Sequence, residues 1–338
     1  MLKVLDEFRQ KLDDIMHRCM DKRIVLYGYG YSGKFIGWYG EYYHSIKPDY
    51  IITQDWSSNI PYEFELYRES LFDFGYKDVK DAVVWLCVPE TEEIRDRLES
   101  HGYVKNETYY DFCELIYDDT GRKGDANNVQ FLRWLEEKYG CDFVTVIPQE
   151  QFKQKMEDTC GYVGSTQKEL FPLLDKCHVC REDAIFDFGC GKGSAMVSFM
   201  DYGFKKVGGV EYQDNIYEIL IHNLKRLGFD DELRSGQISC IHGDAAKLDV
   251  EIDDYNWFFF FDPFSGKLFE RVIQVICKSL ERIPRRIRII YINPRCHDAI
   301  ENTGKFDLTN RFGIMTRQRV VQVYVTKRAF ENYINTYE

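Results

Sequence analysis

The stretch that decides the fold is Ala184-Ile185-Phe186-Asp187-Phe188-Gly189-Cys190-Gly191-Lys192-Gly193. An apolar run typical of a buried strand reaches an acid, and three glycines follow at alternate positions. Residues 194–200 have the composition of the first turns of a helix. Strand, glycine turn and helix in this order form a ligand-binding corner of an open α/β sheet, because glycine lets the backbone turn tightly and approach a ligand. The spacing D-x-G-x-G-x-G differs from the dinucleotide fingerprint G-x-G-x-x-G.

The segments that follow repeat the pattern of a strand that ends at a polar residue. These end residues are Glu211, Asp244, Asp262 and Asn293. The run 257–261 before Asp262 is apolar throughout, as expected of a central parallel strand covered on both faces. Because ligands bind at the carboxyl ends of such strands, we expect one site at this edge, with Glu211 placed to accept hydrogen bonds from two ribose hydroxyls.

Together these segments resemble the class I S-adenosylmethionine (SAM) methyltransferases. The resemblance covers residues 129–327 and is closest to a bacterial group with Asp-Phe-Gly-Cys-Gly-Lys-Gly in motif I. It implies a seven-stranded α/β sheet with an antiparallel closing strand, for which residues 306–309 and 320–325 are the closing pair. It also implies SAM as the cofactor. The cofactor-binding residues that it implies are Asp187, Gly189, Gly191, Gly193, Glu211, Tyr212, Asp244, Ala245, Asp262, Phe264 and Tyr162.

A second glycine corner lies near the N-terminus and has the dinucleotide spacing. It consists of Gly28, Gly30 and Gly33 after the apolar run 24–27, with Asp55 beyond the next strand. This region resembles the small Rossmann-like domains of bacterial enzymes for surface-glycan and nucleotide-sugar biosynthesis. We expect two Rossmann-like domains, at 1–117 and 129–338, joined by the polar linker 118–128. The first domain either binds a nucleotide at this corner or acts structurally, as the contact of a homo-oligomer.

Composition narrows the classes of function. The 338-residue chain has a net charge of −12, which disfavours general binding of nucleic acid, since that relies on basic side chains. No run of about 18 apolar residues predicts a membrane span, and charges interrupt any signal peptide at the start. The 11 cysteines therefore favour a reduced, cytoplasmic setting. The pair Cys177 and Cys180 lacks a second pair of ligands, so we expect no metal site.

The resemblance implies a methyltransferase, and the acceptor is the open question. Asp262 at the end of the fourth strand is the candidate catalytic residue, either as a base or by orienting the acceptor. Asp262-Pro263-Phe264 resembles the [Asn/Asp]-Pro-Pro-[Tyr/Phe] box of amino-methylating enzymes but lacks its second proline. The acidic charge and the first domain favour a small-molecule or glycan acceptor, namely a hydroxyl of a sugar, nucleotide sugar or glycan intermediate.

Three alternatives remain at the level of the sequence. Motif I also resembles that of histone-lysine methyltransferases of the non-SET type, which favours a protein or peptide acceptor. A module that binds SAM without transferring a methyl group would need the same residues. A dehydrogenase that uses the N-terminal corner is disfavoured by the alternate glycines of the larger half.

Overall fold

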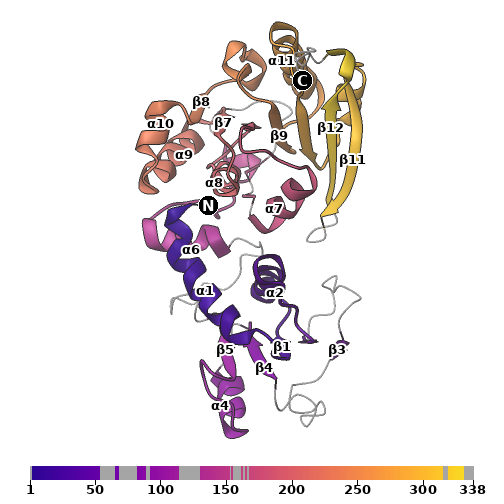
Figure 1. The fold of residues 1–338 in the computed structure, drawn as a ribbon. Helices are drawn as coiled ribbons and strands as arrows, with labels where there is room; N and C mark the ends of the chain where they lie inside the picture. The colour runs from indigo at the N-terminus through magenta and orange to yellow at the C-terminus, as the bar shows by residue number, and fades with distance from the viewer. Residues whose placement is uncertain are drawn as a thin grey trace. The chain divides into compact units, whose positions relative to one another are not determined.

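The computed structural model describes residues 2–53, 65–67, 82–88, 92–113, 130–152, 154, 161–162, 164–165, 167–314 and 319–330. It separates into two units, residues 3–134 and residues 135–338, the second of which includes the first two residues. Figure 1 shows the fold of both units. The predicted linker 118–128 lies outside the described residues, so the domain boundaries 1–117 and 129–338 stay predictions.

The first unit is built on a parallel five-stranded sheet with the order β3-β2-β1-β4-β5. Its strands are β1 (Ile24–Tyr27), β2 (Tyr50–Ile52), β3 (Glu65–Tyr67), β4 (Val83–Leu86) and β5 (Tyr109–Asp111). Its helices are α1 (Asp6–Cys19), α2 (Tyr31–His44) and α4 (Glu92–Ser100), and α6 (Gln130–Tyr139) crosses from this unit into the next. The prediction of a small Rossmann-like sheet at this end of the chain is confirmed.

The glycine corner of this unit joins β1 to α2. A Cβ at Gly33 would lie 2.0 Å from the carbonyl oxygen of Gly28, and a Cβ at Gly28 would lie 2.4 Å from Val88 Cγ1. A Cβ at Gly30 would meet nothing within 4 Å. Chain packing therefore accounts for Gly28 and Gly33 without a ligand, and nucleotide binding at this corner stays a prediction. Asp55 lies outside the described residues.

The second unit carries a seven-stranded sheet with the order β11-β12-β10-β9-β6-β7-β8. Its strands are β6 (Ala184–Phe188), β7 (Lys206–Glu211), β8 (Ile238–His242), β9 (Trp257–Phe261), β10 (Arg288–Ile292), β11 (Phe306–Ile314) and β12 (Arg319–Thr326). Strand β12 runs antiparallel to both β10 and β11. Strands β11 and β12, drawn in yellow in Figure 1, lie at one edge of the sheet. The predicted seven-stranded sheet with an antiparallel closing strand is confirmed.

Helices of the second unit connect and cover the strands. They are α7 (Gln167–Lys176), α8 (Ser194–Tyr202), α9 (Asp214–Arg226), α10 (Asp230–Ser235), α11 (Gly266–Arg282) and α12 (His297–Glu301). Short 3-10 turns occur at Lys3–Leu5, Gln149–Gln151, Ala245–Lys247, Val250–Ile252 and Arg328–Phe330. Within the part of the chain that the structure describes, no helix combines the length and the apolar character that a membrane crossing requires.

The aromatic strand β9 explains why the site lies where it does. Residues 257–260 are all buried, although successive side chains of a strand point to opposite faces, so both faces of the sheet are covered here. The rings of Phe188 and Phe260 stack with centroids 4.9 Å apart and bind β6 to β9. The chain proceeds from β6 to β7 and β8 on one side and resumes at β9 on the other. Such a switch point leaves a crevice at the carboxyl ends of the two strands.

Replacing Gly33 by alanine should destabilise the first unit by about 3 kcal/mol or more, because the new methyl group meets backbone that must shift. Gly30→Ala is the matched control, and we expect it to cost less than about 1 kcal/mol. Differential scanning calorimetry of the full chain would show a lowered transition for Gly33→Ala alone. Equal transitions for the two variants would contradict this account of the corner.

Candidate functional site

A cavity opens at the carboxyl ends of β6, β7, β8 and β9. Of the residues that the sequence analysis singled out for the cofactor, the following line it: Tyr162, Asp187, Gly189, Gly191, Glu211, Tyr212, Asp244, Ala245 and Phe264. Gly193 and Asp262 do not line it. Gly193 instead caps the start of α8 with φ +89°, and a Cβ there would lie 2.5 Å from Leu220. Its role is therefore to complete the turn.

The glycine loop brings bare backbone to the cavity wall. Gly191 has φ +55°, and a Cβ there would lie 2.3 Å from Cδ2 of Tyr162. The ring of Tyr162 thus packs directly on the loop, and its hydroxyl donates to the carbonyl oxygen of Phe143 at 2.6 Å. Burial raises the pKa of Tyr162, so the hydroxyl stays protonated and acts as a donor.

Glu211 ends strand β7 with a carboxylate that is already partly bound. One oxygen accepts from the backbone N–H of Gly191 at 3.0 Å, and the other accepts from the N–H of Gln213 at 2.8 Å. Burial raises the pKa of Glu211, and these backbone donors oppose the rise. Each carboxylate oxygen can accept more than one hydrogen bond, so acceptor capacity remains toward the cavity.

Asp187 has a different environment on the neighbouring strand. It is 3% exposed and lines the cavity. Among the described residues, none donates a hydrogen bond to its carboxylate or forms an ion pair with it. Burial, followed by repulsion from Glu211, raises its pKa well above the usual range. A buried carboxylate without a partner is costly, so this group suits a ligand that brings a cation or strong donors.

The charged side chains among the described lining residues of the cavity are all acidic. Three lining residues carry carboxyl groups, namely Asp187, Glu211 and Asp244, and no lysine, arginine or histidine is among the described residues that line it. Asp244 Oδ1 accepts from the N–H of Ala246 at 2.9 Å and caps the turn that begins at Ala245. An acidic cavity of this kind favours a cationic ligand and disfavours phosphate groups.

Asp262 directly follows β9 but is not among the residues that line the cavity. The Asp262 carboxylate pairs with the guanidinium of Arg295, whose Nε lies 2.7 Å from Oδ1. Pro263 and Phe264 line the cavity in its place, and Pro263 packs against Gly189. The contact with Arg295 fixes the position of the Asp262 carboxylate at the end of β9, and its role as a base or as an orienting residue stays a prediction.

Two residues whose contacts help to build the site were not identified in the sequence analysis. Lys192 of motif I is fully buried and bonded to residues upstream of the loop. The Gln213 side chain pairs with the backbone of Gln154, donating to its carbonyl at 2.6 Å and accepting from its N–H at 3.0 Å. Spacing could not reveal either contact, since the partners lie 50 and 59 residues away.

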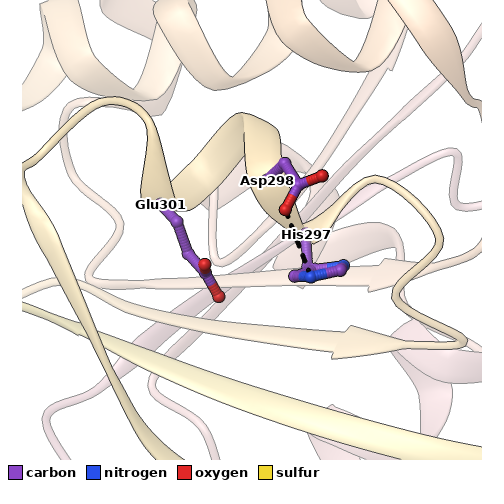
Figure 2. Close-up of side chains that lie close together, drawn as sticks. All are labelled: His297, Asp298 and Glu301. Atoms are coloured by element: carbon purple, nitrogen blue, oxygen red, sulfur yellow. Dashed lines mark ion pairs between the residues drawn. The ribbon is translucent and has the colours of Figure 1, made fainter.

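A cluster of His297, Asp298 and Glu301 lies on α12, as Figure 2 shows. Its ligand-type atoms lie within 4.8 Å of one another, and His297 Nε2 is 3.2 Å from Asp298 Oδ1. Asp298 and Glu301 are exposed, and exposed acids often gather without an ion. The cluster therefore supports no argument for a metal.

Comparison with known proteins gives partial matches. No protein-family model matches the chain. A curated protein-lysine N-methyltransferase of Saccharolobus islandicus (strain REY15A) is 27% identical over 90 residues, which is 26% of this chain. The match spans about half of that relative, 53% of its length.

Solved structures that are similar to part of this chain include an RNA methyltransferase and a ribosomal protein methylase. An RNA methyltransferase from Salinibacter ruber, in complex with S-adenosyl-L-homocysteine, is 14% identical, with a TM-score of 0.37 over 52% of this chain and 100% of that one. A ribosomal protein L11 methylase from Lactobacillus delbrueckii subsp. bulgaricus is 12% identical, with a TM-score of 0.37 over 48% of this chain and 79% of that one. The fold described above rests on the strand order of this chain.

The raised pKa of Asp187 predicts how its removal changes stability with pH. The folded state holds this proton more tightly than the unfolded chain does, so the ionised group destabilises the fold above its folded-state pKa. Asp187→Asn should therefore be more stable than wild type at neutral pH. The difference should shrink as pH falls from the raised pKa toward the unfolded value of about 3.9.

Thermal unfolding across pH measures this difference. Asp230→Asn, at an exposed position on α10, is the matched control and should show little change with pH. A stability gain for Asp187→Asn that grows on acidification would contradict the assignment.

Proposed function

We propose that residues 135–338 bind SAM and transfer its methyl group. The observation that carries the proposal is the cavity with three carboxylates and no basic side chain among its described lining residues. SAM bears a sulfonium, an ammonium and one carboxylate, so it is a net cation with ribose hydroxyls and an adenine amine as donors. A dinucleotide would bring two phosphates to the same acidic edge, which is unfavourable.

The residues present fit this cofactor. Asp187 would receive the ammonium group, since its carboxylate is buried and none of the described residues partners it. Glu211 would accept from the ribose hydroxyls with its remaining capacity, flanked by Tyr212. Asp244 and Ala245 would face the adenine, as the resemblance implies. Gly191 and the Tyr162 ring packed on it both line the cavity, and together they would form the wall against which the methionyl end lies.

SAM supplies a methyl group that is already activated, so the protein mainly positions the acceptor in line with it. Pro263 and Phe264 form an apolar wall at the end of β9, which would help to keep water away from the transfer. Asp262, held by Arg295, would orient a hydroxyl or amine of the acceptor at the edge of this wall.

For the acceptor, we propose a hydroxyl of a sugar, nucleotide sugar or glycan intermediate. The support is the five-stranded first unit with its glycine corner and the net charge of −12. A second candidate is a lysine side chain of a protein. It is favoured by the printed name of the curated relative and by the aromatic residues Phe259, Phe261 and Phe264 in the cavity lining.

Isothermal titration calorimetry tests the cofactor. SAM and S-adenosylhomocysteine should bind wild type, and Glu211→Gln should weaken SAM binding roughly 10- to 100-fold, because hydrogen bonds to a charged acceptor contribute about 1.5–3 kcal/mol each. Glu218→Gln on the exposed side of α9 is the matched control and should bind as wild type does. Binding of a nicotinamide dinucleotide in place of SAM would overturn the proposal.

Methyl transfer from radiolabelled SAM tests the acceptor. We expect labelled product from nucleotide sugars or glycan intermediates and none from peptides that contain lysine, since a hydroxyl acceptor is proposed. Label found only in polypeptide would contradict the sugar hydroxyl as acceptor and favour the lysine side chain. If SAM binds but neither acceptor class nor whole-cell extract gives a labelled product, the result would favour a module that binds SAM without transferring its methyl group.

A further inference from the structure

Lys192 is the part of motif I that the proposed function does not use. The residue is fully buried, yet it is not among the residues that line the cavity. Its ammonium therefore points away from the position assigned to the cofactor. A buried ammonium is costly unless its donors are used, so its contacts must be accounted for.

All described contacts of this ammonium lie upstream of the loop. Lys192 Nζ donates to Asp142 Oδ1 at 2.7 Å and to the carbonyl oxygen of Thr145 at 2.9 Å. It also lies 5.2 Å from the centre of the Tyr162 ring, within the range of a cation–π contact. We call residues 142–147 the strap. Lys192 thus connects the glycine loop to the strap.

The strap has other anchors that keep its path fixed. Glu136 Oε1 accepts from the N–H of Phe143 at 2.5 Å and from the N–H of Val144 at 2.6 Å. The Asn223 amide accepts from the N–H of Asp142 and donates to its carbonyl, at 2.8 and 2.9 Å. The strap should therefore stay folded without Lys192, which makes the contribution of the lysine measurable.

The strap leads back to the cavity through Tyr162. Its hydroxyl donates to Phe143, and its backbone N–H donates to the carbonyl of Ile147 at 2.8 Å. The ring lines the cavity and packs against Gly191. Lys192 therefore acts on the cavity wall by two paths, through the ring itself and through the strap that holds the hydroxyl.

We propose that Lys192 is a positioning residue for the cofactor, which fixes Tyr162 against the glycine loop through the strap. This inference rests on the proposed function. Removing the ammonium frees the ring to leave the wall, so the cofactor loses contacts and dissociates faster. Lys192 touches neither the cofactor nor the acceptor in this arrangement.

The test replaces Lys192 by methionine, which keeps the length of the side chain and removes the charge. Lys192→Met should raise the SAM dissociation constant about tenfold, mainly through the dissociation rate in stopped-flow measurements. Lys206→Met is the matched control. Lys206 Nζ also pairs with an aspartate, Asp254, at 2.9 Å and lies 4.9 Å from a tyrosine ring, but it lies at the start of β7, opposite the cavity. The control should bind SAM within twofold of wild type.

A double-mutant cycle separates positioning from a general loss of stability. Tyr162→Phe removes the hydroxyl bond to the strap and should weaken SAM binding on its own. If Lys192 acts through Tyr162, then Lys192→Met should weaken binding less in the Tyr162→Phe background than in wild type. Fully additive effects on SAM affinity, or unchanged binding by folded Lys192→Met, would overturn the inference.

A second variant tests the inference if Lys192→Met does not fold. Asp142→Asn keeps the backbone bonds to Asn223 and removes the charge opposite Lys192, so it should weaken SAM binding severalfold. Unchanged affinity in this variant would then overturn the inference. Absence of SAM binding by wild type would instead overturn the proposed function, and this inference with it.

Discussion

Two carboxyl groups buried in one cavity, with no basic side chain among its described lining residues, are the constraint on which the site in the second unit depends. Asp187 and Glu211 stand on adjacent strands, and repulsion from Glu211 adds to the cost of a charge on Asp187. Glu211 lowers its cost by accepting backbone N–H groups from the glycine loop and from Gln213. The loop must therefore come close, and that approach is what the glycines allow. A negative charge on Asp187 stays unfavourable, and a cationic ligand in the cavity would stabilise it.

The same constraint explains why motif I contains a lysine that avoids the cavity. A lysine directed at Asp187 would neutralise it and occupy the place of a cationic ligand. Lys192 instead turns to the other side of the loop, where Asp142 and the Thr145 carbonyl satisfy it. The loop thus separates charges, with the carboxyl groups toward the cavity and the ammonium toward the strap. One short turn sets both the charge of the cavity and the attachment of its wall.

The sequence predicted what depends on local pattern and missed what depends on pairs of distant residues. Strand β6 occupies the predicted apolar run, and the run 257–261 forms β9 as expected, because continuous apolar runs specify buried strands. The closing strands are longer than predicted. The residues added to β11 include the polar Asn310 and Arg311, and those added to β12 are Arg319 and Thr326, so the apolar pattern did not mark them as strand. The side-chain pairs at the site could not be foreseen. Asp262 meets Arg295 only because the register sets Phe261 beside Ile292.

The Asp262–Arg295 pair also affects the edge of the sheet at which we propose that the acceptor lies. Asp262 and Asn293 follow neighbouring strands, each precedes a proline, and each has positive φ, +47° and +54°. A residue before proline favours extended backbone, and positive φ is uncommon outside glycine, so both turns are strained. Strain of this kind persists only where surrounding contacts hold it, and the Asp262–Arg295 pair bridges the two turns. The edge is therefore held in a fixed shape beside the apolar wall, as the proposed in-line transfer to an oriented acceptor would require.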